Sequence, residues 1–367
     1  MAQRVMDTHG LEQDVTFAVR EFGQVAAALY RYVTDASSLP LSVLDLAPVS
    51  QGSTSAEALR NTLDLARHTE RLGYHRYWLA EHHNMPGVAS SAPAVLIGHV
   101  AAATERIRVG SGGVMLPNHP PLVVAEQFGT LEAFHPGRID LGIGRAPGTD
   151  GVTAQALRRS AGPLSADDFP QQLAELLHYF EQPTPDQKVV AVNAPGNKPP
   201  LWLLGSSGYS AQVAGLMGIP FAFAHHFSAD NTLPALALYR EAFQPSAVLD
   251  KPYAMVAAAV VAADDDEYAR YIAGPSGLSF LRLRSGKPGL LPSPEEAAAY
   301  PYTDLERLFI EDRARSTIIG GPDTVAREVA ELLEKTAADE LMVTTMVHDH
   351  KDRLRSYELL TKAVRGS

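Results

Sequence analysis

The 367-residue sequence predicts an α/β fold, a closed (β/α)8 TIM barrel with an N-terminal helical extension and an insertion after its seventh strand. Short, continuously apolar runs alternate with longer segments in which apolar residues recur every three or four positions. The short runs are typical of buried parallel strands, and the longer segments of amphipathic helices. Eight such pairs favour a barrel closed on itself. A doubly wound open sheet is the alternative if one strand is misassigned.

The first half of the predicted barrel alternates strictly between strand and helix. Strand 41–46 precedes a helix that begins at the capping box Thr54-x-x-Glu57 and ends before Gly73. The helix at 121–134 is stopped by His135-Pro136-Gly137. The other elements predicted in this half are strands 77–80, 107–110 and 139–143 and helices 93–104 and 168–180.

The second half follows a proline-rich loop at 182–200, in which a short strand at 189–192 is expected. The predicted strands are 201–204, 221–224, 253–261 and 341–346, and the helices are 209–217, 233–243, 324–335 and 351–364. Residues 264–317 interrupt the alternation and are rich in Gly, Pro and Ser. We expect them to form an irregular insertion that leaves the barrel mouth and acts as a lid.

The segment 1–40 stands apart from the barrel domain 41–367. Apolar residues from Leu11 to Tyr32 recur at spacings of four and three, which predicts an amphipathic helix. Whether this helix docks on the barrel, docks on a second subunit or is dispensable stays open.

Composition excludes several classes of function. A net charge of −11 provides no basic surface for nucleic acid or an anionic membrane. The absence of cysteine excludes disulfides, thiolate metal sites and a cysteine nucleophile. No window approaches 18 uninterrupted apolar residues, and no signal peptide is visible. We therefore expect a cytoplasmic protein.

The residues that follow each strand should meet at one mouth of the barrel, where the catalytic groups of such barrels lie. The second strand runs into Glu81-His82-His83, and the sixth into His225-His226. Glycine is concentrated after the third, fourth and fifth strands, which indicates close approach of the backbone to a ligand. Arg145 and three serines at a helix start form a reasonable phosphate cradle. Those serines are Ser206, Ser207 and Ser210.

These residues resemble the bacterial luciferase-like family of flavin-dependent monooxygenases, which are (β/α)8 barrels. The resemblance covers roughly residue 41 to the C-terminus. It rests on Trp-Leu-Ala-Glu-His-His at 78–83, Val-Gly-Ser-Gly-Gly-Val-Met-Leu-Pro at 109–117, Gly-Arg-Ile-Asp-Leu-Gly-Ile-Gly-Arg-Ala-Pro-Gly at 137–148 and Leu-Gly-Ser-Ser at 204–207.

The resemblance implies a site for reduced FMN, which reacts with dioxygen to give a flavin peroxide that oxidises a small organic substrate. His82 matches the family's catalytic histidine. Gly112 and Gly113 match a dipeptide that supports the flavin ring, often through a cis peptide bond. By the same resemblance, the other residues expected to bind the flavin cofactor are Arg145, Gly205, Ser206, Ser207 and Ser210. His83 and His226 are candidates for contact with substrate, and His83 is expected to be the more structural of the two adjacent histidines.

Two positions depart from the light-emitting luciferase subunit. Gly144 stands where that subunit has a reactive cysteine, so bioluminescence is not expected. Ser206 stands where it has a glutamate near the phosphate, a loss of negative charge that is compatible with phosphate binding.

Three alternatives remain. A barrel of the same fold can use a deazaflavin for hydride transfer, or the chain can be a non-catalytic flavin-binding partner subunit. A metal-dependent hydrolase using His82, His83, His225 and His226 is disfavoured, because adjacent residues on a strand point to opposite sides. No metal site is therefore predicted. The expected partners are the substrate, dioxygen, a separate flavin reductase and a second copy of the chain. The reductase is expected because no strand-Gly-x-Gly-x-x-Gly-helix unit is present.

Overall fold

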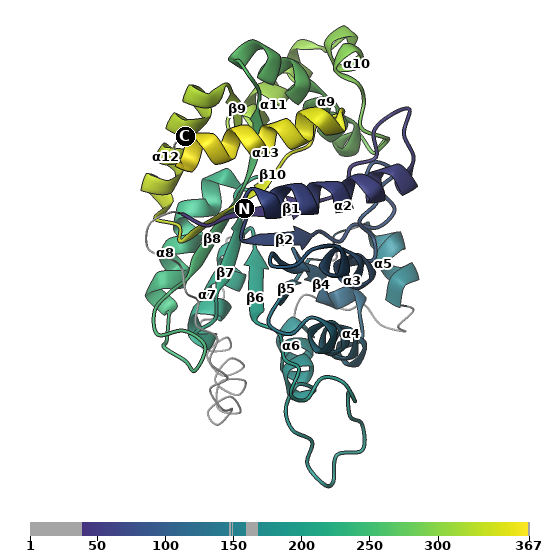
Figure 1. The fold of residues 1–367 in the computed structure, drawn as a ribbon, viewed down its shortest axis with the longest axis vertical. Helices are drawn as coiled ribbons and strands as arrows, with labels where there is room; N and C mark the ends of the chain where they lie inside the picture. The colour runs from purple at the N-terminus through teal and green to yellow at the C-terminus, as the bar shows by residue number, and fades with distance from the viewer. Residues whose placement is uncertain (1–38, 147, 149, 159–167, 366–367) are drawn as a thin grey trace, which may run out of the picture.

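The computed structural model describes residues 39–146, 148, 150–158 and 168–365. Eight parallel strands form a closed barrel, and helices surround it (Figure 1). The barrel strands are β1 (Leu41–Asp45), β2 (Arg76–Leu79), β3 (Arg108–Ser111), β5 (Ile139–Gly144), β6 (Leu201–Gly205), β7 (Phe221–Ala224), β8 (Ala254–Ala262) and β10 (Glu340–Thr344). Each strand pairs with the next, and β10 pairs with both β8 and β1, which closes the ring. The predicted TIM barrel is confirmed.

The helices outside the barrel also agree with the sequence analysis. They are α2 (Ser55–Arg71), α3 (Pro93–Ala103), α4 (Pro121–Phe134), α6 (Phe169–His178), α7 (Gly208–Met217), α8 (Thr232–Ala242), α12 (Pro322–Thr336) and α13 (His350–Arg365). The capping box of Thr54 and Glu57 is formed at the start of α2. None of these helices is long and apolar enough to cross a membrane. The helix predicted within 1–40 falls outside the described residues.

Several short elements were not anticipated. They are β4 (Val114–Met115), η1 (Leu116–Asn118), α5 (Gly151–Arg158) and η3 (Ala229–Asn231). The strand expected at 189–192 is absent, since the long loop between α6 and β6 has no regular secondary structure there. This loop extends well below α4 and α6 in Figure 1.

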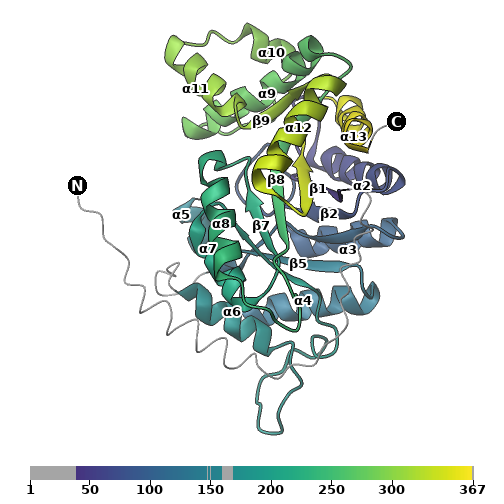
Figure 2. The same ribbon diagram turned by 90° about the vertical axis from the view of Figure 1, so that its left-hand side faces the viewer.

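The insertion 264–317 is not irregular, which corrects the sequence analysis. It contains α9 (Asp266–Arg284), α10 (Pro294–Ala299) and α11 (Asp304–Ala314), and the chain returns through β9 (Thr317–Gly320). Figure 2 shows the three helices together at one end of the molecule, beyond β9. Gly277 and Pro275 lie inside α9. A Cβ atom on Gly277 would be 3.1 Å from Cγ2 of Ile310, so this glycine permits close packing of α9 on α11.

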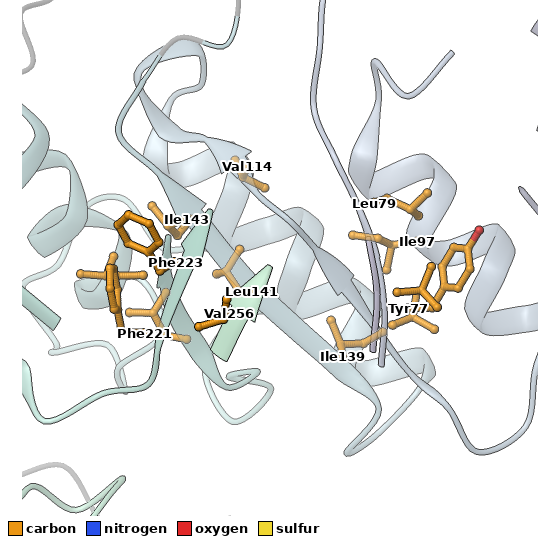
Figure 3. Close-up of a cluster of buried hydrophobic side chains, with 14 of the residues drawn as sticks. Tyr77, Leu79, Ile97, Val114, Ile139, Leu141, Ile143, Phe221, Phe223 and Val256 are labelled. Carbon is orange, nitrogen blue, oxygen red and sulfur yellow. The ribbon is translucent and has the colours of Figure 1, made fainter. Parts of the chain in front are cut away.

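Two apolar cores are separated by the barrel wall. The larger lies between the outer strand faces and the helices, and Figure 3 shows Tyr77 and Leu79 beside Ile97 of α3 within it. Because successive strand residues point to opposite faces, Trp78 points into the barrel. There it packs edge-on against Trp202, with ring centroids 5.1 Å apart.

Charged side chains fill the barrel at the amino ends of its strands. Arg76 donates through Nη1 to Oδ2 of Asp140 at 2.8 Å and through Nε to Oε1 of Glu340 at 3.0 Å. Burial alone would raise the pKa of Asp140, but Arg108 and Arg76 lower it to about 2. This end of the barrel is therefore occupied, and a ligand can enter only from the carboxyl ends.

Candidate active site

A cavity of about 1080 Å³ opens at the carboxyl ends of the strands. Residues that follow β2, β3, β5, β6 and β7 line it, together with residues of the insertion. All ten predicted site residues lie on its wall: His82, His83, Gly112, Gly113, Arg145, Gly205, Ser206, Ser207, Ser210 and His226. The structure thus brings together groups that are up to 144 positions apart, from His82 to His226.

Small inward-facing residues create the space inside the barrel. Gly112, Ala222 and Ala257 line the cavity above the layer of Trp78. The peptide bond between Gly112 and Gly113 is cis, as the resemblance implied. A Cβ on Gly112 would lie 2.6 Å from Cδ1 of Leu44, and one on Gly113 would lie 2.8 Å from the Gly142 carbonyl oxygen. Glycine is therefore required at position 113, where the obstacle is backbone, whereas a larger residue at position 112 would displace the Leu44 side chain.

Arg145 and the start of α7 form one end of the cavity. The Arg145 guanidinium lies over the Tyr209 ring, with Cζ 4.3 Å from the centroid. Ser207 is the N-cap residue of α7, and its side chain makes no capping hydrogen bond. The first N–H groups of a helix lack intrahelical acceptors and favour negative charge. This end therefore offers a cation, hydroxyls and amide donors to an anion.

An ion pair with nearby Asp150 would leave Arg145 unavailable to a phosphate. The Asp150 carboxylate instead accepts from Thr153, through both its backbone N–H at 3.0 Å and its hydroxyl at 2.6 Å. It also accepts from the Asn84 side chain at 3.4 Å. Among the described residues, no carboxylate lies within ion-pair distance of Arg145, so its charge is available to a ligand.

His82 lies on the cavity wall just after β2. Its Nδ1 is 3.3 Å from the carbonyl oxygen of Gly148. Because a carbonyl only accepts, Nδ1 carries the hydrogen and Nε2 carries the lone pair. Burial lowers the pKa of His82, so the ring is neutral at pH 7. The arrangement leaves a neutral imidazole nitrogen as a hydrogen-bond acceptor or proton acceptor.

Glu81 organises the loop after β3, a role that sequence reasoning missed. Its Oε1 accepts from Nε2 of His83 at 2.9 Å and from Nε2 of His119 at 2.8 Å. The same oxygen accepts from the Asn118 amide, and Oε2 accepts from the Met115 backbone N–H at 3.0 Å. Burial would raise the pKa of Glu81, but these donors lower it. The signal was present, since Glu81 and His119 follow neighbouring strands.

Glu81, His83 and His119 bring three potential metal-ligand atoms within 4.8 Å of one another. No other such group occurs in the described part of the chain. Nε2 of His83 and Nε2 of His119 both donate to the Glu81 carboxylate, so hydrogen bonds account for the cluster. We call these three residues the Glu81 clamp.

The two histidines after β7 have different surroundings. His226 is 7% exposed, and its Nδ1 donates to the Ala257 carbonyl at 2.8 Å, whereas its Nε2 has no partner. Burial lowers the pKa of His226 to about 4. His225 shares a 2.8 Å hydrogen bond with Thr232 and does not line the cavity. The four histidines of the hydrolase alternative therefore do not form a single ligand set.

The insertion contributes cavity residues that the sequence analysis did not name. They come from α9, α11 and the loop after α9, and they include Arg270, Phe280 and Arg313. They were not predicted, because their segment was expected to be irregular.

Comparison with known proteins decides the family. The family model described as luciferase-like monooxygenase matches residues 39–340. The chain belongs to the luciferase-like monooxygenase family. It is 54% identical to the uncharacterised protein YvbT of Bacillus subtilis over 322 residues, which is 87% of this chain and 95% of that protein. It is 49% identical to a luciferase-like monooxygenase of Escherichia coli K12 over 88% of this chain and 96% of that one.

Two further likenesses reach characterised or solved family members. The chain is 34% identical to the N-acetyl-S-alkylcysteine monooxygenase of Bacillus subtilis, over 88% of this chain and 98% of that protein. The crystal structure of apo-MsnO8 is 39% identical and superposes with a TM-score of 0.82, covering 89% of this chain and 98% of that one.

More distant structures share the fold alone. One is the oxygenating constituent of 3,6-diketocamphane monooxygenase from Pseudomonas putida in complex with FMN, at 20% identity and a TM-score of 0.66. Another is an F420-dependent secondary alcohol dehydrogenase, at 16% identity and a TM-score of 0.62. Each covers 89% of this chain and is itself covered over 98% of its length. Barrels of this fold thus occur with FMN and with F420 in their titles.

Proposed function

We propose that this luciferase-like protein is a monooxygenase that uses reduced FMN and dioxygen, by way of a flavin peroxide, to oxidise a small organic substrate. One observation carries the proposal. A single cavity joins an anion-binding end, Arg145 and the start of α7, to a glycine-lined floor and two neutral histidines, His82 and His226. The relatives named as monooxygenases support the same reaction class.

The residues present suit FMN. Its phosphate would pair with Arg145 and accept from the serines and amides at the start of α7. Its ring would lie against the apolar floor, where Gly112 leaves room in front of Trp78. Ser206 and Ser207 are exposed to the cavity, and Ser210 lies buried behind them.

Reduced FMN supplies two electrons, so that one oxygen atom of dioxygen enters the substrate and the other leaves as water. The protein's part is to hold the ring, exclude water and control protons. His82 Nε2 is a proton-accepting atom on the cavity wall with no hydrogen bond to another described residue, and we assign it the role of proton acceptor. Helices α9 and α11 contribute residues to the cavity wall, where they would restrict the access of water.

A separate flavin reductase and a homodimeric assembly belong to the same proposal. The reductase is expected because the chain has no dinucleotide-binding fingerprint, and the dimer is favoured by the family resemblance. The reductase requirement predicts that purified protein with NADH and FMN consumes no oxygen until a reductase is added. Light scattering of the purified chain reports the assembly.

Anaerobic titration tests the proposal against its main alternative. Photoreduced FMN should bind to the protein, and later addition of dioxygen should oxidise it with kinetics that differ from those of free FMN. A reduced deazaflavin such as F420 should bind much more weakly. Tight binding of the deazaflavin with no binding of FMN would favour the hydride-transfer alternative. Binding of FMN without any change in its reaction with dioxygen would favour a non-catalytic subunit.

A further inference from the structure

The charge of the cavity wall is opposite to that of the whole chain. The chain carries a net charge of −11, yet the wall includes three arginines, Arg145, Arg270 and Arg313, and one carboxylate, Asp150. Arg145 is assigned to the phosphate, and Arg270 is an exposed residue 3.9 Å from Asp266. Arg313 has no such assignment.

Arg313 is held by aromatic rings and not by a carboxylate. Its Cζ lies 3.7 Å from the centroid of the Phe280 ring. Phe280 in turn stacks on Phe309, with centroids 5.7 Å apart and an interplanar angle of 4°. In the described part of the chain, Arg313 makes no ion pair and its guanidinium has no recorded hydrogen bond. Contact through the face of the guanidinium leaves its N–H edge available for a planar anion.

The neighbours of Arg313 on the same chain do have acidic partners. Arg282 pairs with Glu296 at 2.6 Å, and Arg315 pairs with Asp312 at 3.6 Å. Arg313 is partly buried in the cavity wall, and burial lowers its pKa, although an arginine keeps its charge at neutral pH. A desolvated charge without a counter-ion is unfavourable, so the site favours an incoming anion.

His226 supplies a second recognition group. Its Nδ1 is committed to the Ala257 carbonyl, and its buried Nε2 is an acceptor without a partner. Arg313 and His226 line the same cavity, and the charge of Arg313 adds to the effect of burial on the pKa of His226. A ligand that contacts both side chains must offer an anionic group to Arg313 and an N–H or O–H group to His226.

We infer that the substrate is an organic acid whose anionic group binds Arg313 and whose own N–H or O–H group donates to Nε2 of His226. The inference rests on the proposed function and names its substrate class. Arg313 is then a specificity-determining residue carried by the insertion, separate from the FMN phosphate site on β5 and α7.

Calorimetric binding to the full chain tests this inference without reduced flavin. The probes are N-acetylnorleucine, which has a carboxylate and an N–H, its methyl ester, which lacks the charge, and hexanoate, which lacks the N–H. Wild-type protein should bind the acid at least tenfold more tightly than the ester, because one hydrogen bond to a charged group corresponds to about 10- to 150-fold in affinity.

Variants separate the two recognition groups. Arg313→Ala should reduce binding of N-acetylnorleucine to the level of its ester and leave ester binding unchanged, and Arg313→Lys should recover part of the loss. Arg315→Ala is the matched control, because Arg315 is 81% exposed and outside the cavity wall. His226→Phe should weaken N-acetylnorleucine but not hexanoate. Melting temperatures check that each variant is folded.

Three results would overturn the inference. They are equal or undetectable binding of acid and ester, an equal loss of both in Arg313→Ala, and weaker FMN binding in Arg313→Ala with unchanged acid binding. The last result would make Arg313 a second phosphate ligand. Failure of the proposed function is distinguishable, because it would appear as absent FMN binding in a protein that still prefers the acid.

Discussion

Arg145 and Tyr209 meet at the cavity mouth, with the guanidinium carbon 4.3 Å from the ring centroid. This contact joins the loop after β5 to the first turn of α7, which come from neighbouring strands of the barrel. The aromatic ring holds the arginine in place without neutralising its charge. The position of the charge is thus fixed before any ligand binds.

Removing this charge should weaken FMN binding in a way that depends on the phosphate. Arg145→Ala is expected to weaken reduced FMN binding by roughly 10- to 150-fold, since a hydrogen bond to a charged group contributes about 1.5–3 kcal/mol. Riboflavin binding should be nearly unchanged, and Arg145→Lys should recover part of the loss because lysine lacks the planar fork. Anaerobic titrations measure all of these affinities. An equal loss for FMN and riboflavin would show that Arg145 only holds its loop.

His82 should matter to oxidation and not to flavin binding. We expect His82→Ala to bind FMN normally but to lose substrate oxidation, with the consumed dioxygen appearing as hydrogen peroxide, because the variant lacks the proton-accepting Nε2 that we assign to the reaction. The measurement is the ratio of hydrogen peroxide released to dioxygen consumed. His225→Ala is the control, since His225 does not line the cavity. Wild-type coupling and pH profile in His82→Ala would remove His82 from the reaction.

Glu81 should be a stability residue. Glu81→Ala removes the acceptor for the Met115 amide, the Asn118 amide and two histidines. A buried donor left unpaired costs about 1–3 kcal/mol, and the two histidines are partly exposed and can bind water instead. Counting the Met115 and Asn118 amides alone, we expect the free energy of unfolding to fall by about 2–6 kcal/mol. Denaturant titration measures the change.

A surface carboxylate provides the comparison for Glu81. Glu105→Ala removes a side chain that is 83% exposed and pairs only weakly with Arg106 at 3.5 Å. It should change the free energy of unfolding by less than about 1 kcal/mol. A similarly small effect of Glu81→Ala would show that water or neighbouring groups replace the clamp.

His226 should make the protein sensitive to acid. Burial lowers its pKa from 6.5 to about 4 in the folded state, so the unfolded chain binds its proton more readily. This contribution to stability is complete above pH 6.5 and is lost as the pH falls toward about 4. The loss between pH 7 and pH 5 is about 2 kcal/mol for this group, at about 1.4 kcal/mol per pH unit below the unfolded pKa.

Substitution of His226 tests that linkage. His226→Asn keeps an N–H donor for the Ala257 carbonyl but does not titrate. The difference in unfolding free energy between pH 7 and pH 5 should therefore shrink by about 2 kcal/mol relative to wild type. An unchanged difference would mean that the folded state accommodates a charged His226.

The barrel could be predicted because its strands and helices carry local signals. Continuous apolar runs such as 221–224, the capping box at Thr54 and the proline at the start of α4 all agree with the final fold. The insertion could not be predicted in this way. Pro275 and Gly277 oppose helix formation locally, and α9 forms because it packs on α10 and α11. The capping box of Thr303 and Glu306, which starts α11, was the signal available there.

The site residues show the same difference between what local sequence signals predict and what depends on tertiary packing. Residues directly after strands, such as His82 and Arg145, were placed correctly because parallel strands direct their carboxyl ends to one mouth. Arg313 lies on a helix whose position depends on tertiary packing, so no spacing in the sequence relates it to His226. The Glu81 clamp could not be predicted from local signals, because its residues lie in two loops that only the folded barrel brings together.

The two ends of the insertion lie side by side on the barrel rim. The Ala263 amide donates to the Gly320 carbonyl at 3.1 Å, and β8 pairs with β10 over 255–259 but with β9 over 259–262. The barrel is therefore closed by the part of β8 that precedes the start of the insertion. Lengthening or replacing the insertion leaves that closure intact, and the entropic cost of a longer connection grows only slowly with its length. We therefore expect that the part of the cavity wall carried by the insertion can vary in length while the part formed by Arg145 and the start of α7 keeps its place.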